Sequence, residues 1–271
     1  MNRWQQMLGT FATLARYLAD SLKAGGQIRG WLRWLAEPAA IIAFVLVSRT
    51  ALAQPYYVPT ASMEPTIQIG DALMATMYPS GFSRYSLPFG FGPASQHRLF
   101  EKLPMRGDIA LFRLPRDPSQ VYIKRVIGLP GDRIEMRGGR LFINDRMLPR
   151  RVAGPGEVET EDGTRLPAQE FVETLPGGRE HPIYKLPWGS NLDDTAVFTV
   201  PPGHLFMMGD DRDDSLDSRV ATKDGGVGFV PMENLIGRAD ILLGSYDFVR
   251  AGSFWSWPSR LRLRRFFSHL S

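Results

Sequence analysis

Hydrophobic and polar residues alternate over short runs along most of the chain from position 56 onward. Alternation with a period of two is typical of a strand that buries one face. The pattern predicts strands at 109–112, 121–123, 126–127, 133–136, 140–143, 196–200, 205–208 and 239–243. Gly138 and Gly139 separate two of these runs and suit a tight hairpin turn. We therefore expect a mainly β protein with an antiparallel sheet as its core.

Two stretches interrupt the alternation. Residues 78–103 are rich in Gly, Pro, Ser and aromatic residues without a clear period, which indicates a long loop or extended hairpin. Residues 151–194 are polar and contain Gly-Pro-Gly and Pro-Gly-Gly turns. We expect residues 54–150 and 195–249 to form one β core, with an inserted β-rich subdomain at 151–194.

The N-terminal part has a helical period instead. Residues 4–23 predict an amphipathic helix, either at a membrane surface or on an ordinary protein surface, within a cytoplasmic or interfacial segment at 1–30. Residues 31–53 predict a transmembrane anchor, although their charge-free core at 38–48 is shorter than the about 20 residues of a full span. Snorkelling of Arg49 would lengthen the span. The alternative is a cleaved leader that ends at the Ala-Leu-Ala of 51–53.

The basic residues gather near the two ends of the chain, whose net charge is +4. This distribution favours an anionic membrane over a nucleic acid as the partner. Basic residues exceed acidic ones before the anchor, which predicts a cytoplasmic N-terminus and places everything after residue 53 outside. The tail at 250–271 predicts a basic aromatic helix that lies at a lipid interface or packs on the domain with a solvated basic face.

The composition excludes several kinds of chemistry. The chain has no cysteine, so thiol catalysis, disulfides and cysteine-based zinc sites are impossible. The acidic run at 210–217 fails as a calcium loop because Leu216 replaces the required glycine and Thr222 the bidentate glutamate. We expect no metal and no cofactor. The histidines lack a motif that pairs them with a serine, so a Ser-His-Asp triad has little support.

Four short segments, at 58–66, 105–112, 122–132 and 203–219, are rich in Gly, Pro or unusual polar residues. In this order they closely resemble the conserved boxes of bacterial type I signal peptidases, whose membrane anchor also precedes the serine box. The resemblance implies a serine endopeptidase in which Ser62 is the nucleophile and Lys124 the general base. It also implies that the Ser62 backbone N–H and the Thr60 hydroxyl donate to the oxyanion.

The same resemblance assigns supporting roles. Ser215 would orient the lysine amine, and Asp217 and Arg219 would form an ion pair that braces the site. The family usually has Asn where this chain has Asp211 and Asp214, so the loop carries extra negative charge. We expect Arg212 and Arg219 to compensate that charge.

A lysine can act as a base only when it is neutral, and its ordinary pKa of about 10.4 must therefore be lowered by burial. Lys124 lies beside apolar Ile123 and close to Val126 on a predicted strand. Because side chains alternate along a strand, Arg125 points to the opposite face, where we expect it to remain in water.

The resemblance further implies that the substrate binds as an extended strand between 56–62 and 121–123. The residues expected to contact it are Tyr56, Val58, Pro59, Tyr122 and Ile123. Small pockets there would select Ala-x-Ala before the cut in signal peptides of exported preproteins.

The expected setting is the bacterial inner membrane, with the catalytic domain on the periplasmic side, near the translocation machinery and in contact with lipid. Two alternatives remain. One is a dedicated maturation peptidase with the same site and a single exported client, and the other is a catalytically inactive membrane scaffold.

Overall fold

The computed structural model describes residues 36–42, 53–77, 79–86, 98–160, 163–246 and 261–270. The chain divides into two units, 1–49 and 50–271. In the first unit residues 36–42 are helical. Within the described ranges, no helix has both the length and the apolar character needed to cross a bilayer. The amphipathic helix predicted at 4–23 and most of the anchor predicted at 31–53 lie outside the described residues.

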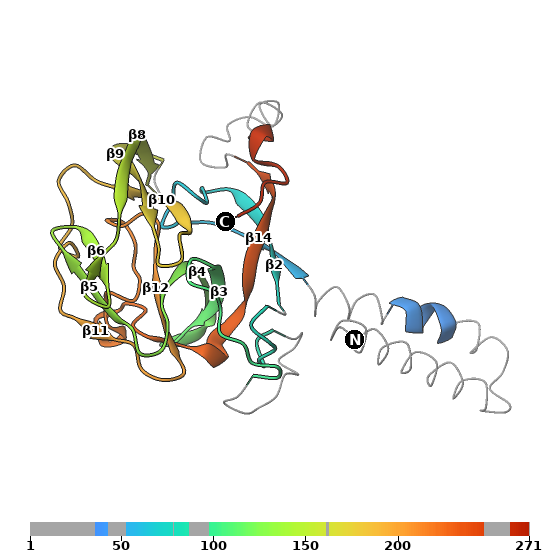
Figure 1. Ribbon diagram of the computed structural model, residues 1–271. Helices are drawn as coiled ribbons and strands as arrows, with labels where there is room; N and C mark the ends of the chain where they lie inside the picture. The colour runs from blue at the N-terminus through green and yellow to red at the C-terminus, as the bar shows by residue number, and fades with distance from the viewer. Residues whose placement is uncertain are drawn as a thin grey trace, which may run out of the picture. The chain divides into compact units, whose positions relative to one another are not determined.

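The second unit is built on a seven-stranded sheet in the order β1-β2-β14-β3-β4-β12-β13, in which all pairs are antiparallel. In Figure 1, β3 and β4 lie beside each other, as do β2 and β14. The strands are β1 (Ala53–Tyr57), β2 (Asp71–Thr76), β14 (Leu235–Ser245), β3 (Ile109–Leu114), β4 (Asp117–Gly128), β12 (His204–Met208) and β13 (Val230–Pro231). The predicted antiparallel β core is confirmed.

The two short strands predicted at 121–123 and 126–127 are one long strand, β4. The ladder with β3 continues through the polar pair between them, with Ala110 opposite Lys124 and Ile109 opposite Arg125. Lys124 and Arg125 therefore lie on the strand, as the alternation predicted, and both are buried.

A second sheet has the order β11-β5-β6-β7. Its strands are β5 (Arg133–Arg137), β6 (Arg140–Ile143), β7 (Arg146–Met147) and β11 (Phe198–Thr199). Gly138 and Gly139 connect β5 to β6 with φ of 52° and 68°. Positive φ at both central residues is the geometry of the tight hairpin turn predicted from the sequence, so that prediction is confirmed.

A third sheet, in the order β10-β9-β8, occupies the region predicted as an insertion at 151–194 and begins one residue before it. Its strands are β8 (Arg150–Glu159), β9 (Arg165–Thr174) and β10 (Glu180–Lys185). The backbone of Tyr184 on β10 bonds both to Asp210 and to Arg212, at 3.0 and 3.1 Å. This sheet therefore supports the acidic loop that follows β12.

The C-terminal segment at 261–270 is not the predicted helix. It contains one 3-10 turn, η5 (Leu263–Arg265), followed by a turn at 266–267, and it has no α-helix. Its backbone forms bridges to the sheet, with His269 opposite Ile241 and Leu261 opposite Tyr246. Hydrogen bonds to the edge of β14 thus replace the internal bonds that a helix would have made. The other short helices are η2 (Thr222–Asp224) and η3 (Met232–Asn234).

Candidate active site

Ser62 lies in a turn that follows β1. Two backbone hydrogen bonds to Val58 close this turn. The Val58 N–H donates to the Asp71 carbonyl at 2.9 Å, and the Val58 carbonyl accepts from the Gly70 N–H at 3.0 Å. Met63 and Ile67 are fully buried in a hydrophobic cluster with strands β2, β3 and β14. Their burial anchors the turn and leaves the Ser62 side chain partly exposed. We call residues 62–70 the nucleophile turn.

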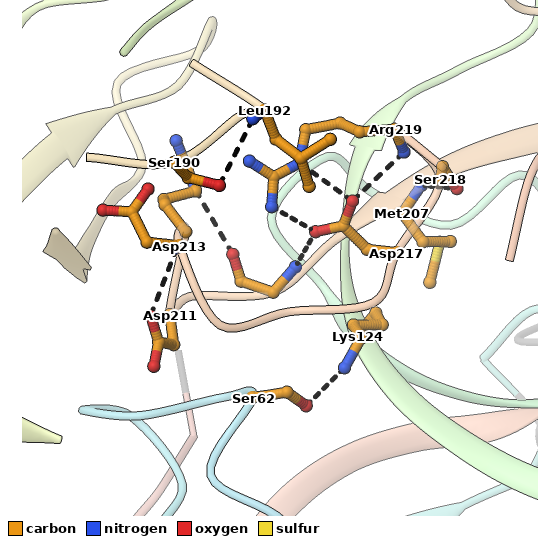
Figure 2. Close-up of polar contacts among 12 residues, drawn as sticks. Ser62, Lys124, Ser190, Leu192, Met207, Asp211, Asp213, Asp217, Ser218 and Arg219 are labelled. Atoms are coloured by element: carbon orange, nitrogen blue, oxygen red, sulfur yellow. Dashed lines mark hydrogen bonds and ion pairs between the residues drawn. The ribbon is translucent and has the colours of Figure 1, made fainter. Parts of the chain in front are cut away.

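Lys124 reaches Ser62 from β4, and its Nζ donates a hydrogen bond to Ser62 Oγ. Figure 2 shows the amine pointing at the hydroxyl. The lysine side chain is buried, with 3% of the residue exposed. Burial lowers the pKa of Lys124 from 10.5 to about 8, against the opposing effect of the Asp217 and Asp210 carboxylates. A substantial fraction of this lysine is therefore neutral near pH 8, as a general base requires.

The prediction that Arg125 remains in water is wrong, because its side chain is fully buried. Its Nε and Nη2 donate to the two carboxylate oxygens of Asp210 at 2.8 and 2.7 Å, and its Nη1 donates to the Gly107 carbonyl at 2.7 Å. Alternation along β4 does turn this side chain away from the lysine. The opposite face of the strand is covered by protein, and a buried guanidinium needs such partners.

The same carboxylate ties the nucleophile turn to β4. Thr66 Oγ1 donates to Asp210 Oδ2 at 2.5 Å, and Arg125 Nη2 lies 3.3 Å from the same hydroxyl. This connection could not be predicted from the sequence, since Thr66, Arg125 and Asp210 are far apart in the chain. It fixes the turn that holds Ser62 against the strand that holds Lys124.

The two groups predicted to donate to the oxyanion lie together at the site. Thr60 and Ser62 both line the same pocket as Lys124. Within the described part of the chain, neither the Ser62 N–H nor the Thr60 hydroxyl has a hydrogen-bond partner. Both donors are thus available to a developing negative charge.

Ser215 lies next to the dyad without bonding to it. Its Oγ is buried and has no partner among the described residues. A Cβ added to Gly209 would lie 2.2 Å from Ser215 Oγ and 2.4 Å from the Ser62 carbonyl oxygen. Gly209 therefore lies where the segments of Ser62 and Ser215 approach each other too closely for a larger residue. The sequence analysis did not identify this glycine.

Asp217 and Arg219 form the predicted ion pair. Arg219 donates to the Asp217 carboxylate through Nε at 2.9 Å and through Nη2 at 2.8 Å, as Figure 2 shows. The carboxylate also accepts the Gly209 N–H at 3.0 Å. The nearby arginine and these hydrogen bonds hold the pKa of Asp217 below its usual range, although burial opposes them. The pair consequently holds Gly209 in place behind the dyad.

The expected compensation of Asp211 and Asp214 by arginine does not occur. Arg219 pairs with Asp217, and Arg212 bonds Glu173 on β9. Asp211 instead accepts the N–H groups of Asp213 and Asp214, and burial raises its pKa to about 7. Its other carboxylate oxygen has no partner within the described ranges. The partner of Arg212 is thus set by the sheet that contains β9 and β10, which contacts this loop. The local sequence does not indicate where that sheet lies.

A pocket of about 620 Å³ adjoins the dyad. All the residues predicted to contact substrate line it: Tyr56, Val58, Pro59, Tyr122 and Ile123. Among the described strands, β1 pairs only with β2, and β12 pairs with β4 only beyond Lys124. The pocket therefore lies beside strand edges that can accept a further strand.

The known proteins whose sequences are similar to this chain include signal peptidases. The family model described as "Signal peptidase, peptidase S26" matches residues 31–243. Signal peptidase I of Rickettsia typhi is 38% identical over 251 residues, which cover 85% of this chain and 90% of that protein. Signal peptidase I of Rickettsia felis is 40% identical over 251 residues, with 86% and 90% covered.

One solved structure is also similar in sequence. It is a signal peptidase I from Enterococcus faecalis, 28% identical, matched over 51% of this chain and 97% of that one. The TM-score of that match is 0.29. On the family match and the signal peptidase I relatives, the chain belongs to the peptidase S26 family of signal peptidases, which are serine endopeptidases.

Proposed function

We propose that this protein removes N-terminal signal peptides from exported preproteins after Ala-x-Ala sequences, with Ser62 as nucleophile and Lys124 as general base. The observation that carries the proposal is the hydrogen bond from the buried Lys124 amine to the Ser62 hydroxyl at the wall of the pocket. A desolvated lysine is one of the recognised ways to activate a serine.

The chemistry follows from this geometry. Neutral Lys124 takes the proton from Ser62 Oγ as that oxygen attacks the scissile carbonyl, and the resulting ammonium then protonates the leaving amine. The Ser62 N–H and the Thr60 hydroxyl stabilise the oxyanion. A water molecule then hydrolyses the acyl-enzyme, with Lys124 again acting as the base.

Substrate binding by strand addition is supported by the edges of β1 and β4. A peptide laid between them would bond their backbones, and alternate side chains would enter the pocket. Val58 and Ile123 are apolar and border the nucleophile, so they suit small aliphatic side chains such as alanine.

We further propose that residues 31–53 anchor the protein in the bacterial inner membrane with a single pass and the catalytic unit on the periplasmic side. Support comes from the apolar run at 38–48 and from the excess of basic residues before it. Preprotein signal peptides and membrane lipids are then the partners, close to the translocation machinery.

Removing the Thr60 hydroxyl should slow catalysis. We expect Thr60→Val to lower kcat about 100- to 1000-fold, because one oxyanion donor is lost. Thr60→Ser keeps the hydroxyl and serves as the matched control, with activity close to wild type. Cleavage of a fluorogenic signal-peptide substrate gives both values, and an active valine variant would exclude this role.

The proposed function is tested with full-length protein in detergent micelles and a panel of preproteins, reading the cut sites by mass spectrometry. Wild type should cut after Ala-x-Ala in many clients, and Ser62→Ala should cut none while retaining the wild-type circular dichroism spectrum. Cleavage of a single client supports the dedicated maturation peptidase instead. No cleavage by wild type supports the inactive scaffold, and activity of Ser62→Ala overturns the mechanism.

A further inference from the structure

The C-terminal segment at 261–270 bonds directly to the nucleophile turn, although almost 200 positions separate them. Arg265 Nη2 donates to the Thr66 carbonyl at 3.0 Å and to Asp71 Oδ2 at 2.5 Å. Its Nε lies 3.2 Å from Asp71 Oδ1. Asp71 is fully buried, and its Oδ2 also accepts the Gln68 N–H at 2.8 Å. One guanidinium thus bonds the turn both directly and through a buried carboxylate.

A second arginine acts on the same turn. Arg262 Nη1 donates to the Ile69 carbonyl at 2.8 Å and lies 3.3 Å from Ser245 Oγ. Both arginines therefore bond backbone carbonyls within a few residues of Ser62. Hydrogen bonds from charged donors are stronger than neutral ones, so these contacts restrain the backbone of the turn.

The segment that carries the arginines is itself fixed to β14. Phe267 N–H donates to the Leu242 carbonyl at 2.8 Å, Leu242 N–H donates to Ser268 at 2.9 Å, and Leu270 N–H donates to Asp240 at 2.9 Å. The Phe266 ring packs against Gly244, where an added Cβ would lie 3.1 Å from its Cζ. The segment that carries the arginines is consequently bonded to the seven-stranded sheet. Through the arginines, it restrains the nucleophile turn relative to that sheet.

Thr66 is held from two sides. Its hydroxyl donates to Asp210, which bonds Arg125 beside the general base, while its carbonyl accepts from Arg265. The first contact holds the turn against the strand of Lys124, and the second holds it against β2 and β14. A misplacement of about 1 Å in such a dyad can cost about 100-fold in rate.

We propose that Arg265, with Arg262, is a positioning residue for Ser62, so that the C-terminal segment holds the nucleophile turn in its reactive geometry. The proposal rests on the proposed role of Ser62. Arg265 is not among the residues that line the pocket, and the bond between Lys124 and Ser62 does not involve it. Its loss should therefore lower the rate of the chemical step and leave substrate binding unchanged.

The test compares Arg265→Gln with Arg264→Gln in the full-length protein. Arg264 is exposed, belongs to the same 3-10 turn and carries the same charge, so it is a matched control. We expect Arg265→Gln to lower kcat about 10- to 100-fold with KM within about twofold. Arg264→Gln should behave as wild type, and Arg265→Lys should recover part of the loss through its contact with Asp71.

Amide hydrogen exchange provides a readout that does not depend on activity. In Arg265→Gln, exchange should accelerate in residues 62–70 and stay unchanged in β3 and β4. An unaltered kcat in the folded variant, or faster exchange spread over the whole unit, would overturn the proposal. If Ser62→Ala remains active, the proposed function fails, whereas the exchange experiment still decides whether Arg265 holds the turn.

Discussion

Replacing Lys124 by methionine should abolish cleavage and, at pH 6, make the protein more stable than wild type. The activity is lost because methionine cannot accept the Ser62 proton. The stability rises because burial lowers the pKa of this lysine from 10.5 to about 8, so the folded state at pH 6 carries a poorly solvated charge. Each pKa unit corresponds to about 1.4 kcal/mol, which limits the gain to about 3 kcal/mol.

The pH dependence distinguishes this cause from better packing. Between pH 8 and 10.5 the unfolded chain binds the lysine proton more tightly than the folded chain, so the wild type becomes more stable as pH rises. The advantage of Lys124→Met should thus be complete below pH 8 and absent above pH 10.5. Urea denaturation at several pH values measures it, and the exposed Lys102, changed to methionine, is the control.

The wild-type rate should follow the same group, rising as pH increases through about 8 and the amine loses its proton. A Lys124→Met variant that still cleaves excludes the lysine as base. A variant less stable than wild type at pH 6 shows that the lysine is not desolvated in the folded protein.

Changing Asp210 to alanine should have the largest effect on stability. The variant leaves the fully buried Arg125 without its carboxylate partner. It also removes the carboxylate that accepts the hydrogen bond of the Thr66 hydroxyl. Breaking a buried ion pair from one side typically costs about 3–5 kcal/mol. We also expect cleavage to fall at least about tenfold, since the nucleophile turn loses its contact with β4.

Two further variants separate charge from position. Asp214→Ala removes an exposed carboxylate from the same loop and should change the free energy of unfolding by less than about 0.5 kcal/mol. The double variant Asp210→Leu with Arg125→Met should regain most of the stability, because apolar replacements of buried ion pairs are often tolerated. Its activity should remain low, since Thr66 still lacks its acceptor. A loss below about 1 kcal/mol in Asp210→Ala would contradict the prediction.

The strands and turns were accessible from the sequence because they depend on local periodicity. Alternation placed β3, β12 and the centre of β14 correctly, and adjacent glycines marked the β5–β6 turn. The same local reasoning failed at β4, where it predicted two short strands instead of one long strand and assigned Arg125 to solvent. It also predicted a C-terminal helix where residues 261–270 form short turns and backbone bonds to β14.

The sequence by itself determined the mainly β architecture and, through the four motif segments, the pair Ser62 and Lys124. Only the tertiary structure decided that the lysine is buried, that Arg125 bonds Asp210, and that Arg265 bonds the nucleophile turn. Burial and ion pairing depend on which distant segments meet in space. Local periodicity carries no information about those meetings, so the chemistry could be located from the sequence while the contacts that tune and hold it could not.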